Sequence, residues 1–212
     1  KKNLEMVIIG PEKPLEYGIV DILEDNNIPC FGPRQKLALL ETSKLFCRTY
    51  LSVLEKELDI KLNPEYYSYD NETDFKKHIK SYTKKFVIKQ DMLAGGKGVL
   101  VMDDHFKTND EGFKICIDYL NKNIQFHIEE KLEGEEFSLM SITDGINIQH
   151  CPPIQDYKRA YSGNNGPNTG GMGCIMNCLS FLESDDIEVS EKINEAVLRN
   201  IKNYINIKNN YK

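Results

Sequence analysis

Residues 89–101 have the composition of a phosphate-binding turn. A predicted strand ending in Lys89 runs into Ala-Gly-Gly-Lys-Gly at 94–98, and a second apolar strand follows. Glycines let the backbone approach a phosphate closely, their N–H groups face the anion, and lysines supply charge. The segment is neither a Walker A loop, since no Ser or Thr follows Lys97, nor a Gly-x-Gly-x-x-Gly dinucleotide turn. A nucleotide lid fits this pattern; the alternative is a tight hairpin with solvated lysines.

An acidic segment occupies residues 128–136. Its sequence, Ile-Glu-Glu-Lys-Leu-Glu-Gly-Glu-Glu, leads from one predicted strand through a glycine into another. Carboxylates in such a connection can accept hydrogen bonds from ribose hydroxyls or an exocyclic amine, and backbone groups can bind the edge of an adenine. The alternative is a solvated acidic turn, which is what most charge runs are.

A third polar segment covers residues 152–173. Lys158 and Arg159 can clamp an anion, and Asp156 can hold an ammonium group or a magnesium-bound water. The Gly-Gly-Met-Gly sequence at 170–173 permits close backbone approach to a small substrate. Because the segment has few apolar residues and many donors and acceptors, we expect an exposed, substrate-binding loop. The alternative is a flexible loop without a ligand.

Hydrophobic periodicity indicates the elements that hold these segments. Apolar runs predict strands at residues 6–9, 86–89, 99–102, 124–128 and 137–142, and Asp144-Gly145 is a hairpin turn signal. Apolar residues at helical spacing predict helices, with Ser43 as a candidate N-cap. The side chains expected to face inward are Ile19, Ile22 and Leu23 in a helix that begins near Pro14, Leu37 and Leu40 after Gln35, Phe46, Tyr50, Val53 and Leu54 after Ser43, Phe113, Cys116, Ile117 and Leu120, and Val189, Ile193, Ala196, Val197, Ile201 and Tyr204. A mixed α+β fold with a strand-rich middle follows.

Composition excludes several classes of function. The 212 residues are 40% hydrophobic and 28% charged, as in an ordinary globular protein. A net charge of −6 argues against nucleic-acid or anionic-membrane partners. No apolar run approaches the roughly 20 residues that span a bilayer. The six cysteines lack a paired framework and lack zinc-site spacing, which predicts a reduced, cytoplasmic setting.

Seven motifs in order carry a resemblance to a known family. They are Gly-Pro-Glu-x-Pro-Leu (10–15), Phe-Gly-Pro (31–33), Leu-Glu-x-Ser-Lys (40–44), Leu-Ala-Gly-Gly-Lys-Gly-Val (93–99), Ile-Glu-Glu-x-Leu-x-Gly-Glu-Glu (128–136), Gln-Asp-x-Lys-Arg (155–159) and Gly-Pro-Asn-Thr-Gly-Gly-Met-Gly (166–173). The sequence resembles the phosphoribosylamine–glycine ligases, also called glycinamide ribonucleotide synthetases, of the ATP-grasp superfamily. The resemblance is continuous from about residue 4 to residue 174.

The resemblance implies a fold and a set of site residues. The fold is ATP-grasp, preceded by a remnant of an α/β (Rossmann-like) domain at residues 1–33; the ATP-grasp domain is 34–212, with a nucleotide lid at 64–128 and part of the main body at 129–212. The implied ATP-binding residues are Arg48, Lys89, Gly95, Gly96, Lys97 and Gly98, with Glu129 and the backbone of Lys131 and Leu132 at adenine and Glu136 at ribose. The implied catalytic residues are Asp156, Lys158 and Arg159, and the implied substrate-binding residues are Asn168, Thr169, Gly170, Gly171 and Met172.

The implied reaction belongs to purine biosynthesis. ATP phosphorylates the carboxylate of glycine, and the amine of 5-phosphoribosylamine then attacks, giving glycinamide ribonucleotide, ADP and phosphate. Magnesium, or alternatively manganese, is the implied metal. We expect the family's Glu and Asn metal ligands to lie beyond residue 212 and its glycine-rich turn for the ribose phosphate to lie before residue 1.

Four residues depart from the family pattern: Arg48, Gln90, Met92 and Tyr157. Three hypotheses follow. The chain is a segment of a working ligase, a short nucleotide-binding module without ligase activity, or an ATP-grasp ligase with another acceptor.

Overall fold

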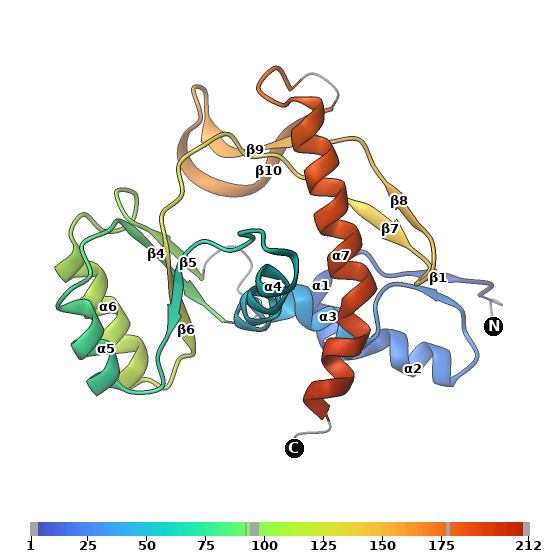
Figure 1. Ribbon diagram of the computed structural model, residues 1–212, viewed down its shortest axis with the longest axis horizontal. Coiled ribbons are helices and arrows are strands. Elements are labelled where there is room, and N and C mark those ends of the chain that lie inside the picture. Colours follow the sequence, from blue (N-terminus) through green and yellow to red (C-terminus); the bar gives the residue numbers. More distant parts are fainter. Residues whose placement is uncertain (1–3, 92, 94–97, 177–178, 210–212) are drawn as a thin grey trace. The chain divides into compact units, whose positions relative to one another are not determined.

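The computed structural model describes residues 4–91, 93, 98–176 and 179–209 (Figure 1); for residues 207–209 it describes the backbone only. The chain forms two compact units, Lys1–Leu132 and Glu133–Lys212. Helices and strands are both present in each unit, which confirms the mixed α+β prediction. The first unit contains β1 (Val7–Ile8), α1 (Glu12–Glu16), α2 (Ile19–Asp25), β2 (Cys30–Phe31), α3 (Gln35–Thr42), α4 (Lys44–Leu58), β3 (Tyr66–Ser68), α5 (Glu72–Ile79), β4 (Phe86–Gln90), β5 (Val99–Val101), α6 (Asn109–Asn121) and β6 (Phe126–Glu130). The second contains β7 (Ser141–Thr143), β8 (Ile148–His150), β9 (Ile154–Tyr161), β10 (Asn165–Met176) and α7 (Ser184–Asn209).

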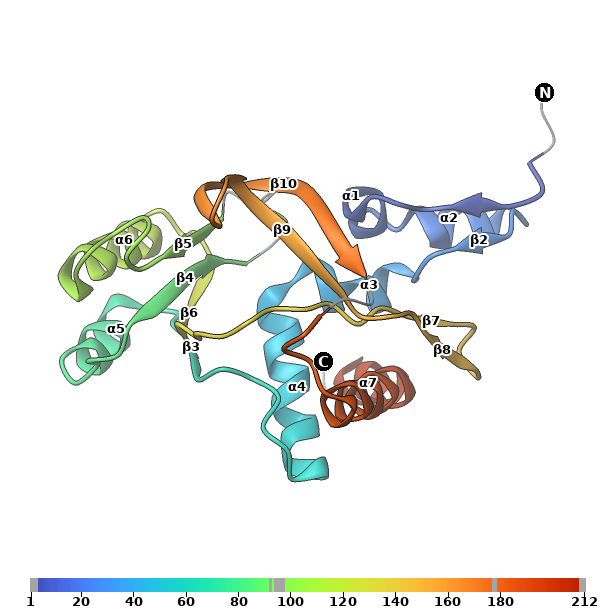
Figure 2. The same cartoon turned by 90° about the horizontal axis from the view of Figure 1, so that it is seen from above.

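A four-stranded antiparallel sheet, ordered β3–β6–β4–β5, is the centre of the first unit. Ile88 on β4 lies opposite Ile128 on β6, and both side chains are fully buried. Helices α5 and α6 cover this face of the sheet (Figures 1 and 2), contributing Phe75, Phe113 and Cys116 to the core. The predicted strands on both sides of the glycine turn and the predicted packing role of Cys116 are therefore confirmed.

The N-terminal segment has two short helices where the sequence predicted one. Gly18 adopts a left-handed conformation, with φ at +72°, and separates α1 from α2. This break rotates the second helix, so Val20 is buried while Ile22 is 55% exposed. The prediction that Ile22 faces inward was wrong, as was the same prediction for Val53 on α4, which is 37% exposed. The strand predicted at residues 6–9 is present as β1, which pairs in parallel with β2.

The second unit corrects the prediction for residues 152–173. The expected polar loop is a long antiparallel hairpin of β9 and β10. Its backbone groups bond to one another across the ladder, so a segment without an apolar face still forms strands. The hairpin turn at Asp144-Gly145 is confirmed between β7 and β8. Two other expectations were wrong: the strand at 137–142 is regular only from Ser141, and Val189 on α7 is 47% exposed.

Candidate functional site

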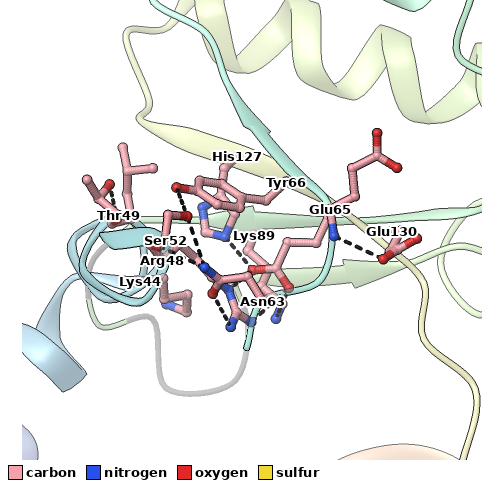
Figure 3. Close-up of polar contacts among 12 residues, drawn as sticks. Lys44, Arg48, Thr49, Ser52, Asn63, Glu65, Tyr66, Lys89, His127 and Glu130 are labelled. Atoms are coloured by element: carbon pink, nitrogen blue, oxygen red, sulfur yellow. Dashed lines mark hydrogen bonds and ion pairs between the residues drawn. The ribbon is translucent and has the colours of Figure 1, made fainter. Parts of the chain in front are cut away.

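Strand alternation places a group of polar side chains on the sheet face opposite the core of the first unit. On β6, Phe126 and Ile128 join the core, so His127 and Glu129 point the other way. On β4 the same alternation turns Lys89 to that face, and Lys89 lies directly opposite His127. This polar face lies against α4 (Figure 3). The side chain of Glu129 is only 4% exposed, so its charge must be balanced by neighbouring groups.

Three side chains bind the buried carboxylate of Glu129. Arg48, from α4, donates from Nε to Oε1 over 2.6 Å and from its second terminal nitrogen to Oε2 over 3.1 Å, a bidentate pair. The Nζ of Lys89 lies 2.6 Å from Oε2, and Nε2 of His127 lies 2.8 Å from Oε1. Burial alone raises the pKa of Glu129, but the contacts with His127, Arg48 and Lys89 outweigh it and hold that pKa well below the ordinary value. These three contacts therefore favour the ionised form of Glu129.

The start of α4 is fixed to the strand that leads into the glycine turn. The hydroxyl of Ser43 accepts from the backbone N–H of Phe46, which confirms the predicted N-cap. Asp91, next after β4, accepts hydrogen bonds from the Ser43 hydroxyl at 2.9 Å and from the backbone N–H of Leu45 at 3.0 Å. Lys44 donates to the carbonyl of Gln90 over 3.1 Å. Helix and strand thus bring Lys44, Arg48 and Lys89 to one place.

These three cations line a cavity of about 700 Å³ within the first unit. That volume lies in the range of small-molecule sites. Its other lining residues are Glu12, Lys13, Leu40, Glu41, Cys47, Leu93, Gly98, Val99 and Glu129. Four predicted ATP-binding residues, Arg48, Lys89, Gly98 and Glu129, therefore border one cavity. Gly95, Gly96 and Lys97, and the departure Met92, lie outside the described residues.

Lys131 and Leu132 are not among the described residues that line that cavity. The backbone N–H of Lys131 donates to the carbonyl of Lys85 over 2.9 Å, and its Nζ lies 2.7 Å from a carboxylate oxygen of Asp103. Leu132 is 67% exposed, and Glu136 is exposed in the second unit. Their predicted roles at adenine and ribose stay predictions.

The hairpin of the second unit brings the predicted acceptor-side residues together. Between two points of the ladder, β10 advances from Asn168 to Gly173 while β9 advances only from Arg159 to Tyr157, so β10 bulges. The hydroxyl of Thr169 fixes this bulge by donating to the carbonyl of Lys158 over 2.9 Å and accepting from the N–H of Gly171 over 3.1 Å.

Charged side chains lie on the strand beside the bulge. Nζ of Lys158 is 3.6 Å from a carboxylate oxygen of Asp156. Arg159 donates to the carbonyl of Gly166 over 2.8 Å. The predicted catalytic residues Asp156, Lys158 and Arg159 and the predicted substrate residues Asn168, Thr169, Gly170, Gly171 and Met172 therefore share one hairpin.

The described part of the chain contains neither a group of metal ligands nor a membrane-spanning helix. Across residues 4–91, 93, 98–176 and 179–209, no cluster of three or more His, Cys, Asp or Glu side chains could hold a metal ion. These residues do not fit the Mg²⁺ or Mn²⁺ that the resemblance implies. In the same part of the chain, no helix is long and apolar enough to cross a membrane.

Comparison with solved structures shows which fold the chain shares. The fold resembles that of D-alanyl-alanine synthetase A from Vibrio cholerae, with a TM-score of 0.66 at 14% identity over 93% of this chain and 60% of that one. The class of protein is defined by a family profile: residues 42–211 match an ATP-grasp domain, so this is an ATP-grasp protein.

Sequence comparison defines the family. The phosphoribosylglycinamide synthetase N-domain profile matches residues 1–41, and the profile of its ATP-grasp (A) domain matches residues 42–211. The chain belongs to the phosphoribosylglycinamide synthetase family.

The relatives are longer than this chain. Phosphoribosylamine–glycine ligase of Methanobrevibacter smithii is 38% identical over 206 residues, which are 94% of this chain and 46% of that protein. The crystal structure of phosphoribosylamine–glycine ligase from Thermotoga maritima gives a TM-score of 0.69 at 31% identity, over 93% of this chain and 47% of that one. The chain therefore spans about half the length of these relatives.

The bulge in β10 depends on one glycine more than on its neighbour. Gly171 has φ at +134°, a conformation that L side chains rarely adopt, whereas a Cβ at Gly170 would meet no atom within 4 Å. We expect Gly171→Ala to destabilise the hairpin by about 1–3 kcal/mol and Gly170→Ala to leave it nearly unchanged. Amide hydrogen exchange of β9 and β10 measures the effect. Equal protection in the two variants would contradict the assigned strain.

Proposed function

We propose that this chain is part of an ATP-dependent ligase that joins glycine to 5-phosphoribosylamine, giving glycinamide ribonucleotide, ADP and phosphate. The observation that carries the proposal is the cavity lined by Lys44, Arg48 and Lys89 in a chain whose residues 42–211 match the family's ATP-grasp domain. We also propose the division made from the sequence: an α/β remnant at 1–33, an ATP-grasp domain at 34–212, a lid at 64–128 and part of the main body at 129–212.

The cavity suits the polyphosphate of ATP. Phosphoryl transfer needs alignment of the reacting groups and neutralisation of charge that spreads over the transferred phosphoryl oxygens. Lys44, Arg48 and Lys89 supply cations, and Gly98 belongs to the turn that would approach the phosphates. Glu129 keeps Arg48 and Lys89 in place before nucleotide arrives, because it binds both.

The hairpin of β9 and β10 suits the acceptor side. A carboxylate is a poor electrophile, and phosphorylation of one glycine carboxylate oxygen turns that oxygen into part of a leaving group. The amine nitrogen of phosphoribosylamine then forms the bond to carbon, the C–O bond to phosphate breaks, and the amine loses a proton. We propose that Lys158 and Arg159 neutralise the acyl phosphate, that Asp156 receives the ammonium group of glycine, and that the bulge at 168–172 supplies backbone donors.

One observation favours a second candidate, a nucleotide-binding module without ligase activity. The carboxylates needed for a metal ion are not gathered in the described part of the chain. Without a metal the phosphates would be less completely neutralised during transfer.

The five described cysteines, Cys30, Cys47, Cys116, Cys151 and Cys174, are free thiols. This observation supports the reduced, cytoplasmic setting that we propose.

One experiment separates the two candidates. The chain is titrated with ATP by calorimetry and is then incubated with Mg²⁺, ATP, glycine and freshly prepared phosphoribosylamine, with product measured by mass spectrometry. Glycinamide ribonucleotide that requires all three substrates supports the ligase. ATP binding without product supports the module, and absence of ATP binding contradicts both.

A further inference from the structure

We propose that His127 is a positioning residue of the nucleotide site: as a neutral imidazole it donates from Nε2 to Glu129 and thereby sets the positions of Arg48 and Lys89. The inference rests on the proposed function, since it assigns the cavity to ATP. No motif in the sequence indicated this histidine.

The position of His127 gives it a role that a solvent-exposed histidine could not have. Its side chain is completely buried, and Nε2 lies 2.8 Å from Oε1 of Glu129, two residues further along the same strand face. Lys89 lies directly opposite on β4. His127, labelled in Figure 3, therefore lies next to the cavity lining, in contact with the carboxylate that binds both cations.

The contacts of the two ring nitrogens select one tautomer. Nδ1 of His127 is buried and has no hydrogen-bond partner among the described residues. A proton on Nδ1 would be a buried donor without an acceptor, which is costly, whereas an unprotonated Nδ1 leaves only a lone pair unused. A proton on Nε2, in contrast, faces the carboxylate of Glu129. The geometry thus favours a neutral ring with its proton on Nε2.

A chain of contacts joins His127 back to Arg48. The ring of Tyr66 meets the His127 ring edge-on, with centroids 6.4 Å apart, and its hydroxyl lies 3.1 Å from the hydroxyl of Ser52 on α4. Asn63 donates to Ser52 over 3.1 Å and accepts from Arg48 over 3.4 Å. Arg48 is therefore held by Glu129 on one side and by Asn63 on the other.

The hydrogen bond from His127 affects how strongly Glu129 binds its cations. Oε1 accepts from both His127 and Arg48, and Oε2 accepts from Lys89 and Arg48. When His127 donates, a neutral imidazole stabilises part of the negative charge on Glu129. Without it, only Arg48 and Lys89 balance the buried charge, and both are drawn more tightly to Glu129. Cations held in this way are less available to phosphates.

Two substitutions separate the donor from the volume of the side chain. In His127→Gln the side-chain amide nitrogen lies at the ε position and can replace the Nε2 donor, while His127→Leu fills similar space without a donor. We expect His127→Leu to weaken ATP binding about tenfold and His127→Gln to stay within about threefold of the unchanged chain. His78→Leu is the matched control: His78 on α5 contacts the hydroxyl of Tyr69 and is not one of the groups bound to Glu129, so this variant is expected to bind ATP normally.

Adenosine binding distinguishes a positioning role from a purely structural one, because loss of structure would weaken the binding of ATP and adenosine alike. Adenosine lacks phosphates, so its affinity should be nearly the same in all variants, and the ratio of ATP to adenosine affinity should fall only in His127→Leu. An equal loss of both ligands, an unchanged ratio in His127→Leu, or equal ratios in the Leu and Gln variants would overturn the inference.

Nitrogen-15 NMR of the imidazole rings tests the inference without nucleotide. A neutral His127 ring with its proton on Nε2 is expected, and a proton on Nδ1 would overturn the inference even if ATP binds. If this tautomer is observed but the unchanged chain does not bind ATP, the proposed function is wrong, and the positioning role that rests on it is wrong as well. The two failures are therefore distinguishable.

Discussion

Replacing Glu129 with alanine is expected to lower the free energy of unfolding by about 3–5 kcal/mol, as for removal of one partner from a buried ion pair. The carboxylate is 4% exposed and is bound by Arg48, Lys89 and His127. Without it, a guanidinium and an ammonium group face each other with no anion between them, and the His127 donor loses its acceptor. Urea unfolding at neutral pH measures the change.

Glu188→Ala is the matched control for this prediction. Glu188 forms an exposed ion pair with Lys192 one turn further along α7, and its side chain is 63% exposed. Water replaces that contact readily, so the loss should be far smaller. Similar losses in the two variants would mean that the Glu129 network does not stabilise the fold.

The same network makes stability depend on acid. Because the folded state depresses the pKa of Glu129, the contribution of this group is fully present above its ordinary value of 4.5 and is lost as the pH falls toward the lower pKa of the folded state. The stability difference between the unchanged chain and Glu129→Gln should therefore shrink as the pH falls below 4.5. A constant difference across this interval would show that the carboxylate is not held ionised.

The sequence predicted strand β4 and the start of α4 better than the residues that contact them. Lys89 could be found because it ends an apolar run just before a glycine turn, and Ser43 because a cap precedes a helical pattern. His127 could not be found in this way. It lies beside Glu129 by alternation along β6, but its place opposite Lys89 follows from the antiparallel register of β4 with β6, which is a long-range property. Asn63 could not be predicted either, because it lies in an irregular segment that only the folded chain brings to Arg48.

Two further features could not be predicted from the sequence: the polar strands β9 and β10, and the break between α1 and α2. Strands β9 and β10 carry glycines, asparagines and charges in place of alternating apolar residues, so periodicity gives no signal for them. Their pairing is visible only in the ladder. The break at Gly18 depends on one backbone conformation within a segment whose apolar spacing continues across it.

Lys89→Met should weaken ATP binding by about 10–150-fold while costing little stability. A charge-assisted hydrogen bond to phosphate contributes about 1.5–3 kcal/mol, which corresponds to that range of affinity. Stability changes little because Arg48 and His127 still bind Glu129 after the lysine is gone. This is the reverse of Glu129→Ala, which leaves two cations without an anion. Calorimetric titration with ATP, together with urea unfolding, measures both quantities.

Lys122→Met is the control, since it removes the same charge from an exposed pair with Asp118 on α6. Equal ATP affinity in the Lys89 and Lys122 variants would remove Lys89 from the nucleotide site. A large stability loss in Lys89→Met would instead show that Arg48 alone cannot balance Glu129. Loss of ATP affinity with stability retained requires that the lysine transfer part of its bonding from Glu129 to phosphate. Lysine can make this exchange because its ammonium group has three donors and a flexible stem, so nucleotide can bind without leaving the buried carboxylate unpaired.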